Sequence, residues 1–290
     1  MKTRVITGAV LLALLAVVVW QIYTPVFVIV FSILCAIATN EIMKCAKIEN
    51  KFIMILGTIV ALCIPYFSSA SILEPIVKTE VWFGIIGFIP KSVWITVIIL
   101  AYFLAMLKDY AHTKFEDVAI AIVASLVVPC VFSLFGVLRD IDGYRNQLGV
   151  YFIFYALICA LATDTGAQLG GMAFGKTKMS PNISPKKTVE GAVCGIIFSV
   201  ALNAVAIALY NRFAIIGLTR TQASVALICA PFISFMSMMG DLTASVLKRN
   251  FDVKDFGKIF PGHGGVMDRF DSSMFTLPLT YCVVMFLLRG

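Results

Sequence analysis

The chain has 290 residues, of which 60% are hydrophobic and only 13% are charged, and its formal net charge is +7. Soluble domains are nearer half apolar and a quarter charged, so this composition excludes an ordinary soluble protein. The apolar residues come in runs close to the roughly 20 residues that a helix needs to cross a bilayer. The sequence therefore predicts an all-α, polytopic integral membrane protein embedded in a lipid bilayer.

About nine transmembrane helices are expected from these apolar runs. In chain order they are Val5–Tyr23, Pro25–Cys45, Phe52–Phe67, Val93–Leu107, Val118–Leu138, Val150–Gly170, Val189–Tyr210, Ala223–Leu247 and Ser273–Leu288. The apolar run at 81–90 is too short to cross, and its Gly and Pro indicate an interfacial segment.

Most of the 23 lysine and arginine residues fall near the N-terminus and in the alternate loops that share its side. The positive-inside rule makes that side cytoplasmic, so the N-terminus and the charged loops 171–188 and 248–271 are expected in the cytosol. We predict a multi-pass protein of the cell (inner or plasma) membrane. Residues 1–140 would form a scaffold of about five spans, and residues 141–290 a second region that carries polar residues inside or beside its helices.

One short motif points to a nucleotide. The stretch GGMAFGKT, at 170–177, fits the P-loop pattern G-x-x-x-x-G-K-[ST]. A P-loop needs a buried strand before the motif and a helix directly after it. Here an apolar helix precedes the motif, and Pro181 and Pro185 follow it where a helix should open. We interpret the match as a coincidence.

Two aspartates lie inside predicted membrane helices. Asp164 and Asp241 each carry a charge that costs about 2.5–3.5 kcal/mol at mid-helix, less near the interface, so neither is expected to face lipid. Ser245 and Lys248 follow Asp241 at helical spacing and share its face. The alternative is an interfacial cap with a snorkelling lysine.

The loop 248–271 combines glycines, cations and carboxylates. Glycines can turn backbone amides toward an anion, and lysine or arginine can pair with phosphate oxygens. Asp268 and Asp271, three residues apart, would share one side of a first helical turn. Carboxylates beside phosphate are what Mg²⁺ requires. The alternative is a charged loop whose carboxylate merely complements a helix N-terminus.

Ser245 to Asp271 reads S-x-L-K-R-x-x-x-x-K-D-x-G-x-x-x-P-x-H-G-G-x-x-D-R-x-D. This pattern resembles the signature of the phosphatidate cytidylyltransferases, also called CDP-diacylglycerol synthases. Asp164 to Ala167 and the segment 174–191 resemble two further blocks of that family. The resemblance implies the reaction CTP + phosphatidate → CDP-diacylglycerol + pyrophosphate, with CTP and phosphatidate as the substrates.

The resemblance also leads to a set of role hypotheses. Asp241 and Asp268, supported by Asp271 and Asp164, would hold Mg²⁺ and a second, monovalent or divalent cation. The catalytic residues would be these four aspartates with Lys187 and Lys248. The residues expected to bind substrate are Lys186 and Lys187 (triphosphate), Lys248 and Arg249 (lipid phosphate), Gly262, Gly264 and Gly265 (backbone amides to phosphate), and Ser245, His263 and Arg269.

Two other functions stay open at this point. A CTP-dependent lipid kinase, such as a polyprenol kinase, has the same needs but releases CDP instead of pyrophosphate. An ion-coupled transporter would also use acidic residues in membrane helices. Against it, the charged residues gather at the cytoplasmic rim and not at the midplane. No nucleic-acid partner is expected, and a homodimer is compatible with the sequence.

Overall fold

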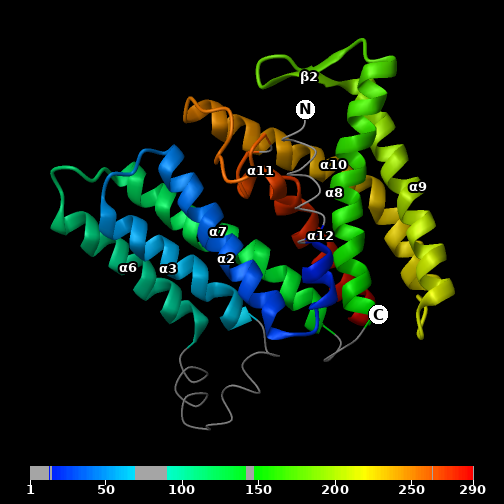
Figure 1. Ribbon diagram of the computed structural model, residues 1–290, viewed down its shortest axis with the longest axis horizontal. Helices are drawn as coiled ribbons and strands as arrows, with labels where there is room; N and C mark the ends of the chain where they lie inside the picture. Colours follow the sequence, from blue (N-terminus) through cyan, green and yellow to red (C-terminus); the bar gives the residue numbers. More distant parts are fainter. Residues whose placement is uncertain (1–12, 14, 69–89, 142–146, 263, 290) are drawn as a thin grey trace, which may run out of the picture. The chain divides into compact units, whose positions relative to one another are not determined.

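The computed structural model describes residues 13, 15–68, 90–141, 147–262 and 264–289, and these are mostly helical (Figure 1). The helices are α2 (Pro25–Cys45), α3 (Lys51–Ser68), α6 (Lys91–Lys108), α7 (Phe115–Asp140), α8 (Gln147–Phe174), α9 (Val189–Phe213), α10 (Arg220–Asn250), α11 (Met267–Phe270) and α12 (Ser273–Arg289). The strands are β1 (Lys178–Ser180) and β2 (Ser184–Thr188). Residues 5–12 and 14 of the first predicted span, and residues 81–89 of the predicted interfacial segment, lie outside the described residues.

The chain divides into two compact units. The first contains Met1–Asp140 and Asp255–Met267, and the second contains Ile141–Lys254 and Asp268–Gly290. The predicted loop 248–271 is therefore divided between the two units. Its middle part belongs to the first unit, and its two ends belong to the second.

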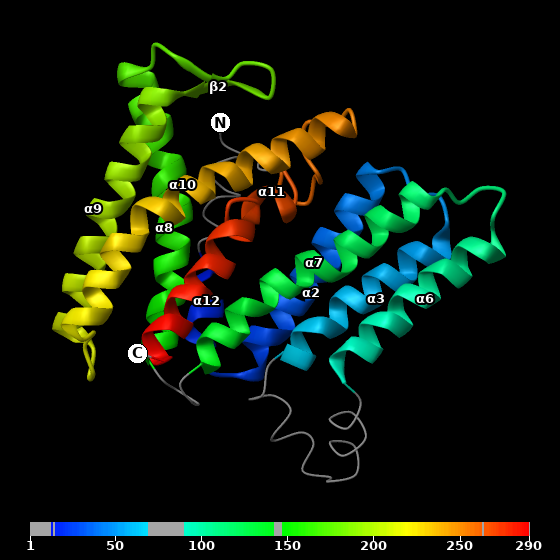
Figure 2. The ribbon, with the colours of Figure 1, turned by 180° about the vertical axis from the view of Figure 1, so that it is seen from behind.

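In the first unit, α2, α3 and α7 pack on one another and α6 lies beside α3 and α7 (Figure 2). Pro25 opens α2, where its fixed φ suits the first helical turn. The buried hydroxyl of Thr39 donates a hydrogen bond to the carbonyl oxygen of Ala124 at 2.9 Å. Polar side chains inside these apolar helices thus find partners on neighbouring backbone, as a medium without water requires.

In the second unit, α8 and α9 run side by side in close contact (Figure 1). Glycines allow this approach, since a Cβ on Gly195 would lie 2.6 Å from the carbonyl oxygen of Thr163 and one on Gly166 would lie 2.7 Å from Cβ of Phe198. Small residues at a helix interface are typical of membrane proteins, where packing drives association. α10 packs on α8, α9 and α12.

Within the part of the chain that the structure describes, six helices are long and apolar enough to cross a membrane: α2, α3, α7, α8, α9 and α10. Two shorter apolar helices correspond to α6 and α12. The prediction of a multi-pass helical membrane protein is confirmed to this extent.

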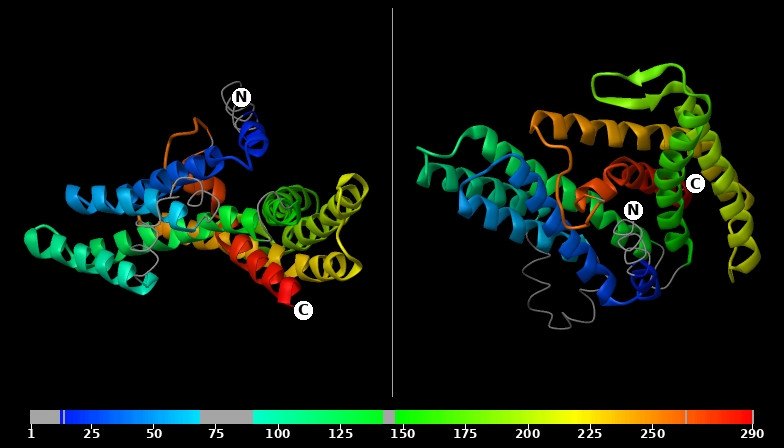
Figure 3. Two further views of the ribbon diagram at one scale, coloured as in Figure 1. Left: turned by 90° about the horizontal axis from the view of Figure 1, so that it is seen from below. Right: turned by 45° about the horizontal axis from the view of Figure 1, so that its top comes forward.

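The β1–β2 hairpin, which was not predicted from the sequence, extends past the ends of α8 and α9 (Figure 3). Pro185 lies within β2. Both strands of a two-stranded sheet are edge strands, so a proline can be accommodated there although it lacks a backbone donor. The hairpin connects the two helices and carries Lys186 and Lys187 on β2.

The glycine contact between α8 and α9 predicts the effect of a small substitution. Gly195→Ala places a methyl group against the Thr163 carbonyl and should lower the stability by about 1–3 kcal/mol, because overpacking forces the two backbones apart. The measurement is the thermal unfolding midpoint of the purified protein in detergent. Ala204→Val, on an exposed part of α9, is the control and should leave the midpoint unchanged. Equal midpoints for Gly195→Ala and wild type would contradict this description of the interface.

Candidate active site

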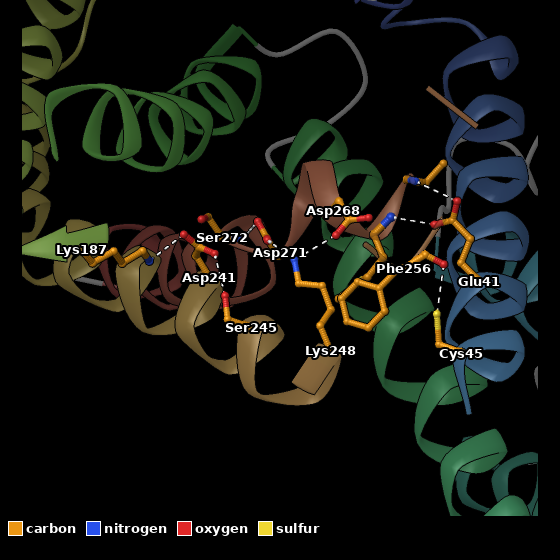
Figure 4. Close-up of polar contacts among 12 residues, drawn as sticks. Glu41, Cys45, Lys187, Asp241, Ser245, Lys248, Phe256, Asp268, Asp271 and Ser272 are labelled. Atoms are coloured by element: carbon orange, nitrogen blue, oxygen red, sulfur yellow. Dashed lines mark hydrogen bonds and ion pairs between the residues drawn. The ribbon is translucent and has the colours of Figure 1, made fainter. Parts of the chain in front are cut away.

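Asp241 on α10 lies between a lysine and a serine (Figure 4). The ammonium of Lys187, from β2, is 2.6 Å from one carboxylate oxygen of Asp241. The hydroxyl of Ser245, one helical turn along α10, donates to the other oxygen at 3.5 Å. The expected juxtaposition of Asp241 and Ser245 on one face is therefore present. Lys187 is brought to that face by the hairpin, which the spacing along α10 could not indicate.

A second set of contacts surrounds the turn between α11 and α12. The hydroxyl of Ser272 donates to Asp164 of α8 at 3.2 Å, and the backbone N–H of Ser272 donates to Asp271 at 2.8 Å. One residue therefore contacts two of the predicted carboxylates. On the other side of the turn, a Cβ on Gly240 would lie 2.8 Å from the carbonyl oxygen of Asp271, so the glycine lets α10 approach closely.

Lys248 joins the two ends of the charged loop that belong to the second unit. Its ammonium is 2.9 Å from Asp268 and 4.0 Å from Asp271. The side chains of Lys248 and Asp268 are 13% and 3% exposed, so this ion pair is largely shielded from water. Charge-assisted hydrogen bonds of this kind are roughly twice as strong as neutral ones.

The carboxylates are close enough to affect one another. Burial, and next the negative charge of Asp241, raise the pKa of Asp271 to about 7, although Lys248 acts in the opposite direction. Asp164 contributes a further, smaller increase. Negative charge therefore exceeds what the lysines neutralise at Asp271, and an additional cation would relieve the repulsion.

The donor chemistry of this site suits Mg²⁺, which prefers oxygen ligands and commonly takes one or two carboxylates together with substrate phosphates and water. Within the described part of the chain, no group of three or more His, Cys, Asp or Glu side chains is arranged to hold a metal ion. Instead, lysine or serine lies between successive aspartates, as in the contacts of Lys248 and Ser272. An aspartate pair completed by substrate oxygens is the arrangement that these residues could provide.

Three further predicted substrate-binding cations lie on the surface of the second unit. Lys186, Arg249 and Arg269 are exposed, near Lys187, Lys248 and Asp268 respectively in the sequence. Their neighbours in sequence belong to the carboxylate cluster, so exposed positive charge is available around it.

The glycine-rich segment belongs to the first unit. Gly262 and Gly264 have φ values of 78° and 84°, which other residues rarely adopt, and Phe260 N–H donates to the Gly264 carbonyl at 2.9 Å. His263 lies outside the described residues. The predicted role of Gly262, Gly264 and Gly265 in binding phosphate stays a prediction.

Sequence reasoning missed Glu41, a buried residue of α2 in the first unit. Its two carboxylate oxygens each accept one backbone hydrogen bond, from Val266 and from Met267, both at 3.1 Å (Figure 4). Two amides that follow the glycines are thus bound by an internal carboxylate. The available signal was that Glu41 is the acidic residue of the apolar run 25–45, and such a residue normally has a specific partner.

The P-loop interpretation of GGMAFGKT is excluded by the structure. Its glycines lie at the end of α8, and a strand instead of a helix follows Thr177. The amides of Lys176 and Thr177 donate to the carboxylate of Glu190 at 3.0–3.1 Å, so they do not form a phosphate cradle.

Comparison with known proteins identifies relatives along the whole chain. The sequence model of the cytidylyltransferase family matches residues 2–287. The phosphatidate cytidylyltransferase of Bacillus subtilis is 32% identical, over 97% of this chain and 96% of that protein. Proteins of the same name from Staphylococcus saprophyticus and Staphylococcus aureus are 44% and 42% identical, each over 45% of this chain and 48% of their own length.

The shielded ion pair predicts the consequence of removing its lysine. Lys248→Met leaves Asp268 and Asp271 without their shared cation and should cost about 1–3 kcal/mol, read as a lower thermal unfolding midpoint. Adding Asp271→Asn should restore part of the loss, because one of the repelling charges is gone. Lys254→Met, at an exposed loop position, is the control. A midpoint for Lys248→Met equal to that of the control would contradict the proposed charge balance.

Proposed function

The chain belongs to the cytidylyltransferase family, and from this membership we infer that it transfers a cytidylyl group from CTP to phosphatidate, giving CDP-diacylglycerol and pyrophosphate. The protein is thus a nucleotidyltransferase of phospholipid biosynthesis in a membrane. The observation that carries this conclusion is the match to the Bacillus subtilis enzyme across 97% of the chain. A lipid kinase or an ion-coupled transporter is not favoured by these relatives.

The reaction is a displacement at phosphorus. An oxygen of the phosphatidate phosphate attacks the α-phosphorus of CTP, the bond from that phosphorus to the bridging oxygen breaks, and pyrophosphate leaves. The attacking phosphate is already ionised near neutral pH, so no general base is needed. Catalysis of this kind depends on positioning and on neutralising the charge of two polyanions.

The lysines of the cluster would supply that neutralisation. Lys187, with Lys186 beside it, would contact the triphosphate or the departing pyrophosphate. Lys248 and Arg249 would contact the lipid phosphate, with Ser245 and Arg269 as further ligands. This assignment is supported by the ion pairs of Lys187 and Lys248 with aspartates, since a substrate phosphate could replace or share those partners.

Mg²⁺ would be held by Asp241 and Asp268, with Asp271 and Asp164 as supporting ligands and a second cation nearby. A bound cation would neutralise charge on the phosphate oxygens in the transition state. The proposal is supported by the oxygen donors that these residues offer and by the raised pKa of Asp271, which burial causes first and the negative charge of Asp241 next.

We further propose nine transmembrane helices with a cytoplasmic N-terminus, in the cell membrane. Eight apolar helices in the described residues and the lysine and arginine distribution support this topology. Residues 1–140 would serve mainly as scaffold and residues 141–290 would carry the catalytic side chains. The loops 171–188 and 248–271 would then face the cytosol, where CTP is available.

The proposed roles predict the behaviour of two isosteric variants. Asp241→Asn and Asp268→Asn should each lower formation of CDP-diacylglycerol by at least about 100-fold, since removing one group that stabilises charge in a transition state, such as an oxyanion-hole donor, typically costs about 2.7–4 kcal/mol. Purified protein in detergent is assayed with labelled CTP, phosphatidate and Mg²⁺. Asp252→Asn, an exposed residue of the same loop, is the control and should keep wild-type activity. Full activity of either variant, or of wild type in EDTA, would contradict the metal assignment.

A further inference from the structure

Glu41 is buried in a membrane helix and bound to backbone, far in sequence from the predicted catalytic residues. It is 6% exposed, and its carboxylate accepts hydrogen bonds from the amides of Val266 and Met267. Both amides belong to the first unit, as does Glu41. A carboxylate in an apolar helix is costly, and here two backbone donors satisfy it.

Two glycines of the loop lie directly against this carboxylate. A Cβ on Gly257 or on Gly265 would overlap the carboxylate of Glu41, so neither position tolerates a side chain while Glu41 is in place. The thiol of Cys45, one turn along α2, lies 3.1 Å from the carbonyl oxygen of Phe256 in the same segment. The absence of a side chain at two of the loop positions is therefore explained without phosphate, because it lets the chain pack closely around Glu41.

The bonded amides lie directly before the catalytic residues of α11. Met267 is the first residue of α11, and Asp268 is the next one along the chain. Fixing the amides of Val266 and Met267 therefore fixes where α11 begins and limits where Asp268 can lie. Asp268 is buried and pairs with Lys248, so a small displacement would disturb an ion pair that has little room to adapt.

We propose that Glu41 is a positioning residue for the reaction, which acts by holding the start of α11 and hence Asp268. This inference rests on the proposed function. It assigns a part in cytidylyl transfer to the N-terminal helices, and it gives Gly257 and Gly265 the role of accommodating the Glu41 carboxylate.

The test is Glu41→Gln in the full-length protein, with product formation measured per folded molecule. Glutamine keeps the size of glutamate but offers one oxygen and one NH₂ group, so a donor faces one of the two amides. We expect kcat to fall roughly tenfold to a hundredfold, as for a displaced catalytic group, while KM for CTP changes by less than about twofold. Glu41→Asp keeps two acceptor oxygens and should recover part of the lost kcat.

Thr39→Val is the matched control for a merely structural role. Thr39 is buried on the same helix and makes one side-chain hydrogen bond, to Ala124 and not to the loop. It should lower the thermal midpoint without lowering kcat per folded molecule. If Glu41→Gln keeps wild-type kcat, or loses activity only in proportion to the folded fraction as Thr39→Val does, the proposal is overturned.

A double substitution tests the glycine contact separately. Gly265→Ala alone should be strongly inactivating, but in a Glu41→Ala background it should add little, because the carboxylate it would overlap is absent. Additive losses would overturn the assigned role of Gly265.

Amide hydrogen exchange of the wild-type protein tests whether Glu41 holds the amides of Val266 and Met267, even where the variants fail to fold. The amides of Val266 and Met267 should exchange much more slowly than that of the exposed Lys258. Equal exchange rates would overturn the proposal. If the wild type forms no CDP-diacylglycerol, the proposed function fails, while the exchange measurement still reports whether Glu41 holds the loop.

Discussion

The second unit depends on one electrostatic constraint: four aspartates gather where burial makes negative charge expensive. Lys187 and Lys248 make this possible, since each is paired with a carboxylate at 2.6–2.9 Å. The balance is incomplete, because burial and neighbouring charge still raise the pKa of Asp271 to about 7. A site in this condition would favour a bound cation, and its lysines could exchange their carboxylate partners for phosphate oxygens. The uncompensated negative charge is unfavourable in the protein alone. It would be neutralised by a bound cation, which a reaction between two polyanions also requires.

Close backbone packing is what brings these charges together. Glycines let α8 approach α9, and Gly240 lets α10 approach the turn that carries Asp271 and Ser272. The hairpin then directs Lys187 onto α10. In the first unit, Gly257 and Gly265 perform a comparable task around Glu41. Small residues thus let these segments approach one another closely, as expected where packing and not the hydrophobic effect holds helices together.

The sequence was sufficient for features that local pattern determines. Apolar runs predicted the membrane helices, and an aspartate inside such a run marked Asp164 and Asp241 as parts of a polar site. Contacts between distant segments were not predictable in this way. Nothing in the spacing indicates that Ser272 contacts Asp164, or that Glu41 binds amides about 225 positions away. The hairpin was missed because its prolines argue against regular structure, although an isolated two-stranded sheet tolerates them.

The central claim is that this cluster of lysines and aspartates serves attack at the α-phosphorus of CTP. Position-labelled CTP tests it most directly, with phosphatidate in detergent and the lipid and aqueous products separated. The account predicts that label from the α-phosphate enters the lipid and that label from the γ-phosphate leaves as pyrophosphate. Label from the γ-phosphate in the lipid, with release of CDP, would contradict it.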